Sequence, residues 1–598
     1  MTIIHGLNHV PTSATVAIAG GGPSGTYLAL RLAAAGIDSV VIEPRTEVDR
    51  LRPRAKTTNA RTMTLLAGLD IDGTTLAEAV RETAALPVSY SQDVIFCTGL
   101  NGYELRRFHG AFQLVDGRYD IQPECGQQIP QPDVEQVLRN AADASELITF
   151  VTGTRALRAD TGPTRLSVTS ADETADDEVH TIEARWIIGA DGGTSRVRRS
   201  LGIGLQGTSA PRPNFNVVFT SANLREHVTI DPAVQWWIVN EKISGMIGEL
   251  DRDGTWWAIL QGCEAIADPA EVAATIRTMT GVGAEVDINV LATDSWTARM
   301  LLADSYGGAE SNGSVFLVGD AAHLNPPWGG HGFNTCISDA ENLAWKLIAV
   351  HEGWADPALL ASFEEERRPV AARMIADAAV NGKSLAYDFV DPILRETGAE
   401  ADAARVRVHE ALAVKMSEFH SEGLVLGYEY AGTSRVQAGP VPFVDAIEYR
   451  GQALPGCLLP HFWREDGASI YPDFAGFTVF ALPEETAAGR AVPDDVAVRQ
   501  TDAAIAEVEA IARAQSVPLQ VIRLTGPDAR KALDLWGDAM LLVRPDHHIA
   551  AIVPSPRGLT TTTTEARAES CTTGGILGTA LRIATAHASV GARESEDS

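Results

Sequence analysis

A glycine-rich stretch, GGGPSG at residues 20–25, constrains the fold of this chain more than any other feature. It directly follows the apolar run VAIA (16–19) and precedes an apolar pattern of helical spacing at 27–35. Gly36 ends that pattern, and SVVIE (39–43) is typical of a second buried strand. Strand, glycine turn, helix and strand predict a βαβ unit, so we expect an α/β domain built on a parallel sheet.

The glycines of this stretch fit the pattern GxGxxG at Gly20, Gly22 and Gly25. The first glycine permits a tight turn, the second lets the backbone approach a pyrophosphate, and the third allows close helix packing. Glu43 ends the second strand, where a carboxylate accepts hydrogen bonds from ribose hydroxyls and repels a 2′-phosphate. The pattern therefore favours FAD or NAD, with a purely structural glycine turn as the alternative.

Two later segments lead from apolar runs into glycine and aspartate. RWIIGADGG occupies 185–193 and GSVFLVGDAAH occupies 313–323, and both predict strands of the same parallel sheet. Between them, residues 215–257 form a β-rich region of alternating apolar and polar residues. GDAAHLNPPWGGHGFN (319–334) lacks the glycine order that a second pyrophosphate needs, so we interpret it as the other end of one cofactor. The isoalloxazine ring of a flavin must be reached by loops from distant parts of the chain, so these two later segments favour FAD over NAD.

The composition excludes several classes of partner. Lysine and arginine number 48 against 78 aspartates and glutamates, and the formal net charge of −30 repels nucleic acid and anionic membranes. The apolar stretches are interrupted before they reach the length of a membrane helix, and the first ten residues lack the pattern of a secretory signal. Six cysteines lie far apart without a CxxC pair, so we expect neither disulfides nor a metal site. These features predict a cytoplasmic protein.

Three motifs follow one another along the chain: GGGPSG with Glu43, GADGGTSRVRRSLGI (189–203) and the segment 319–334. PRAKTTNARTM, PQPDVEQVL and LASFEEERRPVA lie between and after them. Together these segments resemble the para-hydroxybenzoate hydroxylase family of single-component FAD monooxygenases over nearly the whole chain. LPGCLLPHFW and LLVRPD resemble the C-terminal thioredoxin-like domain of its phenol-hydroxylating branch. TNARTM and GHGFNTCISDAENLAWKL are most similar to the part of that branch that contains 2,4-dichlorophenol 6-monooxygenase.

The resemblance implies an α/β fold with a discontinuous, Rossmann-like FAD-binding domain, a β-sheet substrate domain and a C-terminal thioredoxin-like domain. The expected FAD-binding segments are 1–85, 121–205 and, with a helical region, 299–438; the expected substrate-domain segments are 86–120 and 206–298; the expected C-terminal domain is 439–598. Because this last region lacks CxxC, we expect it to serve packing or dimer contacts instead of dithiol chemistry.

The resemblance also implies roles for single residues. Arg54 would lie beside the flavin, Gln131 would contact it, and Asp191 belongs to an Asp-Gly motif linked to both FAD and NAD(P)H. Asp320 would bind the ribityl and pyrophosphate region. The expected cofactor-binding residues are Gly20, Gly22, Pro23, Ser24, Gly25, Glu43, Arg45, Arg54, Ala55, Gln131, Asp191, Asp320, Pro327, Gly330, Gly332, Phe333 and Asn334.

The candidate catalytic residues are Arg54 and His331. His331 stands where the family commonly has glutamine, and Trp328 stands where a smaller residue is usual, so we expect the surroundings of the flavin ring to differ. His323 is either a neighbour of the flavin or a turn histidine. The candidates for the substrate wall are Phe215, Trp237, Trp296, Pro327 and Trp328, each with plain core packing as the alternative.

The implied reaction is hydroxylation of a phenolic ring. NAD(P)H reduces FAD, O₂ gives a flavin C4a-hydroperoxide, and its outer oxygen is transferred to an electron-rich carbon. A flavin halogenase is not favoured, because VQWWIV and TWWAIL do not match WxWxIP. A Baeyer–Villiger or polyketide-tailoring oxygenase of the same fold and a flavoprotein that only sequesters an aromatic ligand remain as alternatives. A homodimer is the candidate assembly.

Overall fold

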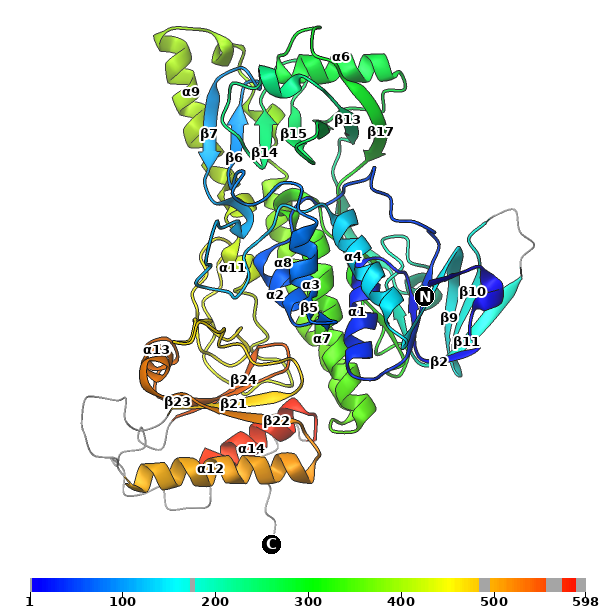
Figure 1. The fold of residues 1–598 in the computed structure, drawn as a ribbon, viewed down its shortest axis with the longest axis vertical. Helices are drawn as coiled ribbons and strands as arrows, with labels where there is room; N and C mark the ends of the chain where they lie inside the picture. The colour runs from blue at the N-terminus through cyan, green and yellow to red at the C-terminus, as the bar shows by residue number, and fades with distance from the viewer. Residues whose placement is uncertain (1–2, 173–177, 483–494, 555–572, 588–598) are drawn as a thin grey trace.

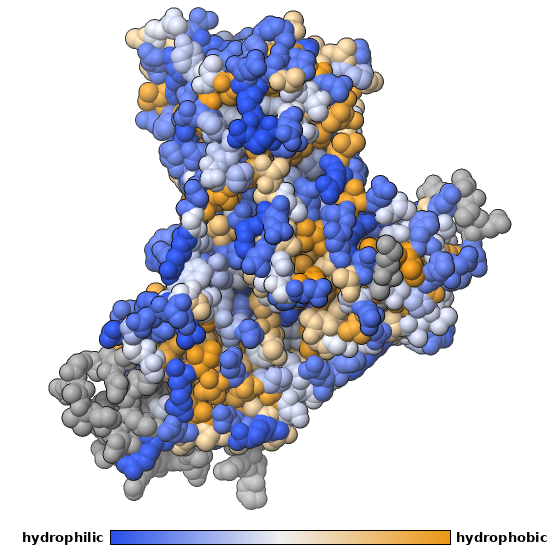
Figure 2. All heavy atoms as spheres, viewed as in Figure 1, coloured by the Kyte–Doolittle hydropathy of each residue, from blue (hydrophilic) through white to orange (hydrophobic). Residues whose placement is uncertain are grey.

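The computed structural model describes residues 3–172, 178–482, 495–554 and 573–587. A central α/β region lies between a sheet region at the upper end of Figure 1 and a smaller sheet region at its lower end. The sequence is of low complexity at TTTTT (560–564) and ARESEDS (592–598), and both segments lie outside these residues. No helix within them is long and apolar enough to cross a membrane. Figure 2 shows polar side chains over most of this face, with apolar side chains gathered at the waist below the upper region and over the lower region.

The central region is built on one eight-stranded sheet. Its strands are β1 (Ile3–His5), β2 (Ser13–Ala19), β3 (Ser39–Glu43), β8 (Ile148–Thr152), β9 (Thr154–Thr161), β10 (Thr164–Ser170), β11 (Val179–Gly189) and β19 (Val315–Leu317). β2 pairs in parallel with β3 and β11, and β11 pairs in parallel with β19. The prediction that strands from distant parts of the chain share one parallel sheet is therefore confirmed. β9 and β10 extend the sheet as antiparallel strands.

Two long helices begin at the carboxyl edge of this sheet. Helix α1 (Pro23–Ala34) follows β2, and helix α7 (His331–Glu352) follows the segment after β19. They pack side by side, and a buried ion pair between Arg31 and Glu341 joins them at 2.7 Å. Their N-termini therefore lie at the edge where nucleotides bind in folds of this kind. Other helices of this region are α2 (Ala60–Ala67), α3 (Leu76–Glu82), α4 (Gln131–Ala144), α5 (Arg196–Ser200) and α8 (Ser362–Asn381).

The upper region contains one seven-stranded sheet. In spatial order its strands are β17 (Asn289–Trp296), β13 (Asn214–Thr220), β16 (Thr255–Gln261), β15 (Gly245–Glu249), β14 (Gln235–Ile238), β6 (Val94–Cys97) and β7 (Glu104–Phe108). Strand side chains alternate between the two faces. Phe215 and Trp236 belong to the apolar cluster that helix α6 (Pro269–Thr280) covers, whereas Trp237 and Trp257 belong to the cluster on the other face. That second face supplies one wall of the cavity described below.

The lower region is a four-stranded sheet with helices on both of its faces (Figure 1). In spatial order its strands are β22 (Leu519–Arg523), β21 (Phe477–Ala481), β23 (Ala539–Val543) and β24 (Ile549–Pro554). Helices α12 (Asp495–Ala514) and α14 (Thr573–Ala584) cover one face, and α13 (Gly526–Trp536) covers the other. The apolar runs FTVFAL (477–482), LQVIRL (519–524) and MLLVRPD (540–546) predict three strands from the sequence, and β21, β22 and β23 confirm them to within a few residues. The thioredoxin-like assignment stays a prediction.

Buried charges join the lower region to the helices of the central region. Arg544, after β23, binds Glu366 on α8 at 2.7 Å and Asp546 at 2.6 Å. Lys346 on α7 binds the same glutamate at 2.8 Å. All four side chains are buried. Because an uncompensated buried charge is costly, these pairs hold the lower region in one position against α7 and α8.

Candidate active site

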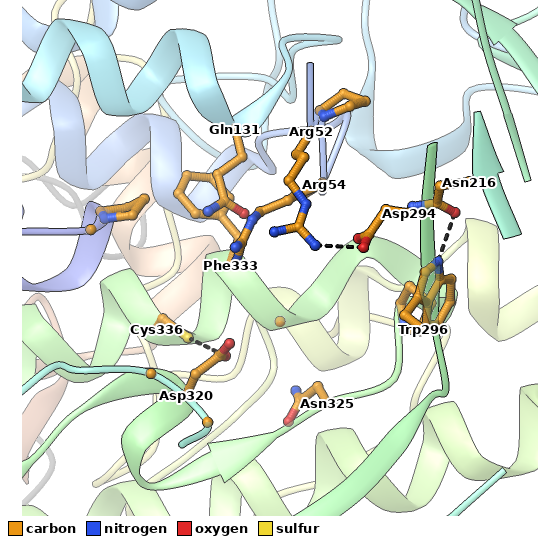
Figure 3. Close-up of a pocket in the computed structure, with 18 of the residues that line it drawn as sticks. Arg52, Arg54, Gln131, Asn216, Asp294, Trp296, Asp320, Asn325, Phe333 and Cys336 are labelled. Carbon is orange, nitrogen blue, oxygen red and sulfur yellow. Dashed lines mark hydrogen bonds and ion pairs between the residues drawn. The ribbon is translucent and has the colours of Figure 1, made fainter. Parts of the chain in front are cut away.

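One large cavity lies where the central region meets the upper sheet (Figure 3). Its volume is about 1110 Å³, which is large beside the roughly 300–1,000 Å³ of common ligand pockets. One side is formed by the glycine turn, the end of β3, the loop 51–57, the start of α4, the end of β11 and the segment 320–336. Strands β13 to β17 form the other side. The cavity thus connects a nucleotide-binding edge with the inner face of a second sheet.

The glycine turn has the open backbone that a pyrophosphate needs. Gly22, Pro23 and Ser24 line the cavity, and no atom lies within 4 Å of the place that a Cβ on Gly22 would take. Gly22 is also the N-cap of α1 and supplies no side-chain cap, so the first N–H groups of the helix are available to an anion. Gly20 has φ +107°, and a Cβ there would lie 2.2 Å from the carbonyl oxygen of Ala190.

Glu43, the expected ribose ligand, is buried at the end of β3 and lines the cavity. Its Oε2 accepts a hydrogen bond from the Gly21 N–H at 2.8 Å, and its Oε1 accepts one from Arg45 Nε at 2.7 Å. Arg45 also pairs with Glu135 on α4 at 2.7 Å. Each carboxylate oxygen has two lone pairs, so Glu43 retains capacity for a ribose hydroxyl while Arg45 fixes its orientation.

Three residues singled out by the resemblance line the same cavity. Arg54 has φ +49°, a conformation that is uncommon for a residue other than glycine and that clusters at functional sites. The Gln131 N–H donates to the Ala55 carbonyl at 2.8 Å and holds the start of α4 against this loop. Asp191 Oδ2 accepts from the Arg196 N–H at 2.6 Å, while its Oδ1 is buried without a partner among the described residues. That oxygen is available to a ligand hydroxyl.

The segment after β19 brings a carboxylate and a helix N-terminus to the cavity. Asp320 lies in the short turn η4 (Gly319–Ala321) and faces the Cys336 thiol, with 3.7 Å between Oδ1 and Sγ (Figure 3). Gly330 precedes α7 without capping it by a side chain, and Gly332 and Phe333 also line the cavity. The N-terminus of a helix attracts negative charge, so this end suits an electron-rich part of a ligand.

Three of the expected cofactor-binding and catalytic residues lie outside the cavity wall. A Cβ on Gly25 would lie 2.1 Å from the Gly20 carbonyl oxygen, so this glycine serves the close packing of α1. The Asn334 side chain donates to the Gly330 carbonyl at 2.8 Å and accepts from the Asn59 N–H at 3.0 Å. It fixes two loops of the wall without being part of it. His331 is buried, and burial lowers its pKa to about 4.

The two candidate catalytic residues, His331 and Arg54, differ in their position relative to the cavity. His331 does not line the cavity, and its imidazole is neutral over the usual working range of pH. Its ring packs beside Gly329, where a Cβ would lie 2.5 Å from His331 Nε2. Arg54 does line the cavity and carries a permanent charge.

Four of the five residues expected in the substrate wall line the cavity, namely Trp237, Trp296, Pro327 and Trp328. The indole N–H of Trp296 donates to Asn216 Oδ1 at 2.7 Å (Figure 3). Trp328 packs against the backbone of Gly382, where a Cβ would lie 2.4 Å from the ring. A tryptophan therefore fits at position 328 because the end of α8 has no side chain there.

Phe215 does not line the cavity, because it lies on the opposite face of the upper sheet. On β13, Phe215 and Phe219 point into the core under α6, whereas Asn216 and Val218 line the cavity. The alternation of apolar and polar residues around Asn216 indicates, from the sequence alone, that Phe215 and Asn216 face opposite sides of the sheet. Trp257 and other residues of the cavity wall were not predicted from the sequence. Adjacent strand residues face opposite ways, so one member of the pair in TWWAIL had to face the cavity.

His323 is a buried structural residue. Its Nε2 lies 2.7 Å from Asp339 Oδ2, and Arg367 Nε donates to Asp339 Oδ1 at 2.7 Å. Burial raises the pKa of Asp339, but His323 and Arg367 outweigh it and hold that pKa below its ordinary value. Asp339 also accepts the Gly319 N–H at 3.2 Å, so this cluster fixes the turn that carries Asp320. Of the two roles considered for His323, the structure supports the turn histidine.

The donor set fits the pyrophosphate and the sugar hydroxyls of FAD. The uncapped N-terminus of α1 beside Gly22 suits a pyrophosphate. Glu43 has lone pairs for a ribose, and the orphaned Asp191 Oδ1 can accept from a further hydroxyl. Within the described residues, no group of three or more histidine, cysteine, aspartate or glutamate side chains could hold a metal ion.

The fold and this cavity define a flavin-dependent oxidoreductase. Residues 13–378, more than half of the chain, match the FAD binding domain family, and the chain belongs to that family. FAD is therefore its cofactor.

Its relatives are FAD-dependent monooxygenases. The chain is 28% identical to the FAD-dependent monooxygenase apdD of Emericella nidulans, over 90% of this chain and 87% of the relative. It is also 28% identical to the 2,4-dichlorophenol 6-monooxygenase of Delftia acidovorans, over 89% of this chain and 94% of the relative. The solved structure of RebC with bound 7-carboxy-K252c superposes with a TM-score of 0.79 at 27% identity, covering 97% of this chain and all of the other. The chain is thus an enzyme, an FAD-dependent monooxygenase.

Proposed function

We propose that this monooxygenase hydroxylates the ring of a phenolic small molecule, with NAD(P)H and O₂ as co-substrates. The observation that carries the proposal is the single cavity that joins the glycine turn to a chamber walled by Trp237, Trp257 and Trp296. An aromatic ring bound against these tryptophans would lie next to the part of the cavity reached by Arg54 and the N-terminus of α7. The 2,4-dichlorophenol 6-monooxygenase among the relatives supports a phenol as substrate.

The residues proposed to bind FAD are those expected from the sequence that line the cavity: Gly20, Gly22, Pro23, Ser24, Glu43, Arg45, Arg54, Ala55, Gln131, Asp191, Asp320, Pro327, Gly330, Gly332 and Phe333. Bound FAD supplies the reduction by NAD(P)H and the activation of O₂. The chain itself orients the aromatic ring and excludes water from it. Exclusion of water is the task of the buried Trp237, Trp257 and Trp328. NAD(P)H is proposed to dock transiently near Arg54, and a cytoplasmic homodimer is the proposed form of the enzyme.

A rapid-mixing experiment tests this function. The yellow holoenzyme is mixed with NADH or NADPH, with and without a panel of phenols, and flavin absorbance and products are followed. We expect a phenol to accelerate the bleaching of the flavin and a hydroxylated product to follow. Reduction without oxygenated product from every phenol would instead indicate a protein that only sequesters an aromatic ligand.

A Baeyer–Villiger or polyketide-tailoring reaction is the second candidate, because two relatives of the chain are named putative polyketide hydroxylases. Including polycyclic quinols and ketones in the same panel distinguishes the two. Insertion of oxygen beside a carbonyl would favour this second candidate, and hydroxylation of a ring carbon would favour the first.

A further inference from the structure

Lys56 lies at the junction of the two sides of the cavity. It belongs to the loop between β3 and α2, and its side chain lines the cavity. Its Nζ lies 4.3 Å from the centroid of the Trp257 ring on β16. The amine thus lies against the aromatic wall, and the ring attracts it whenever the amine is protonated.

No acidic side chain of the cavity neutralises Lys56. The carboxylates that line the cavity are Glu43, Glu135, Asp191, Asp294, Asp320 and Glu418. Glu43 and Glu135 pair with Arg45, Asp294 pairs with Arg52 at 2.5 Å, and Glu418 pairs with Lys415. Asp191 caps α5, and Asp320 faces Cys336.

The amine of Lys56 therefore has no anionic partner within the part of the chain that the structure describes. Burial without a compensating negative charge lowers the pKa of Lys56 to about 7. Arg54, on the same loop, adds a second positive charge to this part of the cavity. An oxyanion of a ligand would supply the missing charge.

Two further donors of this wall also lack acceptors. The indole N–H groups of Trp237 and Trp257 are buried without a hydrogen-bond partner among the described residues, and both side chains line the cavity. An indole N–H and an ammonium group can only donate. This wall therefore combines an aromatic surface with donors and a latent positive charge, which together fit an aromatic ring that carries an acidic oxygen.

We propose that Lys56 binds the acidic hydroxyl oxygen of the aromatic substrate and holds it as a phenolate. This proposal rests on the proposed function. The O–H bond of the bound phenol breaks, its proton forms a bond to the neutral Nζ, and the electron pair stays on the oxygen. The resulting ammonium–phenolate pair lies on the Trp257 ring. Because the ionised oxygen enriches the ring in electrons, Lys56 selects phenols that ionise over the corresponding methyl ethers.

The test uses 4-nitrophenol, whose phenolate form is coloured, as a probe of the holoenzyme. Difference spectra against the holoenzyme alone, recorded across a pH series, give the pKa of the bound probe. We expect binding to wild type to lower that pKa by about one unit or more, since an opposite charge at contact distance has such an effect. Lys56→Met should abolish the shift, and Lys56→Arg should retain it. Lys242→Met, which removes an exposed lysine, is the matched control and should behave as wild type.

The outcomes separate this proposal from its premise. The flavin spectrum without probe should be the same in all four proteins, which excludes an effect through misfolding or cofactor loss. No shift in wild type, or an undiminished shift in Lys56→Met, would overturn the role of Lys56 even if phenols are hydroxylated. A shift that depends on Lys56 in an enzyme that hydroxylates no phenol would sustain the binding site and reject the proposed function.

Discussion

Glu366 connects the lower region to the helices that support the cavity, and its removal has a calculable effect. Its carboxylate is fully buried and accepts hydrogen bonds from Arg544 at 2.7 and 2.8 Å and from Lys346 at 2.8 Å. Burial raises the pKa of Glu366, but Arg544 and Lys346 outweigh it and hold that pKa at about 2, against an ordinary value of 4.5. Glu366→Gln leaves two buried cations without this counter-charge.

The size of the effect on the free energy of unfolding follows from the shift of the Glu366 pKa. A carboxyl pKa lowered from 4.5 to about 2 corresponds to roughly 3 kcal/mol of stability at neutral pH. Removal of one partner from a buried ion pair typically costs about 3–5 kcal/mol, in agreement. Because the folded pKa is depressed, this stability is fully present above pH 4.5 and is lost as the pH falls towards 2.

Urea unfolding of the holoenzyme measures this effect. We expect Glu366→Gln to lower the free energy of unfolding by about 3 kcal/mol at neutral pH, and the difference from wild type to shrink as the solution is acidified below the ordinary carboxyl pKa. Glu241→Gln removes an exposed carboxylate as the control, and its effect should stay within about 0.5 kcal/mol. A loss below about 1 kcal/mol for Glu366→Gln, or a loss that does not depend on pH, would show that this buried ion pair does not stabilise the fold.

Three further predictions concern the cavity. Gly22→Leu should weaken FAD binding at least about tenfold, measured by flavin titration, without changing the unfolding temperature of the flavin-free protein, because the new side chain meets only open space. Trp237→Phe should raise the KM for a phenolic substrate, whereas Trp236→Phe, next to it on the opposite face of β14, should leave the KM unchanged. His331→Gln should leave the pH profile of kcat unchanged between about pH 6 and 8, since burial keeps this imidazole neutral there; a lost limb in that range would assign it a catalytic role.

Local sequence patterns were sufficient for the parts of the fold that depend on neighbouring residues. The glycine turn, α1 and β3 follow from spacing within about 25 residues, and the parallel pairing of β2, β11 and β19 follows from their shared apolar runs. The cofactor end of the cavity was predictable for the same reason. Gly22, Glu43 and Asp191 each lie at or just after the end of a strand, and the carboxyl ends of parallel strands meet at one edge.

The remaining features depend on tertiary contacts that no local pattern encodes. His331 and Asn334 lie in a motif at the cavity, but the rotation of the first turn of α7 directs them away from the wall. Lys56 has its role only because Trp257, some 200 residues further on, lies beneath its amine. The pairing of Glu366 with Arg544 likewise joins two regions that are distant in the sequence. Such contacts are set by the packing of whole domains.

The proposed hydroxylation of a phenolic ring is tested most directly by following the oxygen atoms of O₂ in the reaction. The holoenzyme is supplied with NAD(P)H, a phenol that it accepts and O₂ carrying a heavy oxygen isotope, and the product is analysed by mass spectrometry. We expect one heavy oxygen atom in a new hydroxyl group on the ring for each substrate molecule converted. A product whose new oxygen comes from water, or consumption of NAD(P)H and O₂ without any labelled aromatic product across the panel of phenols, would contradict it.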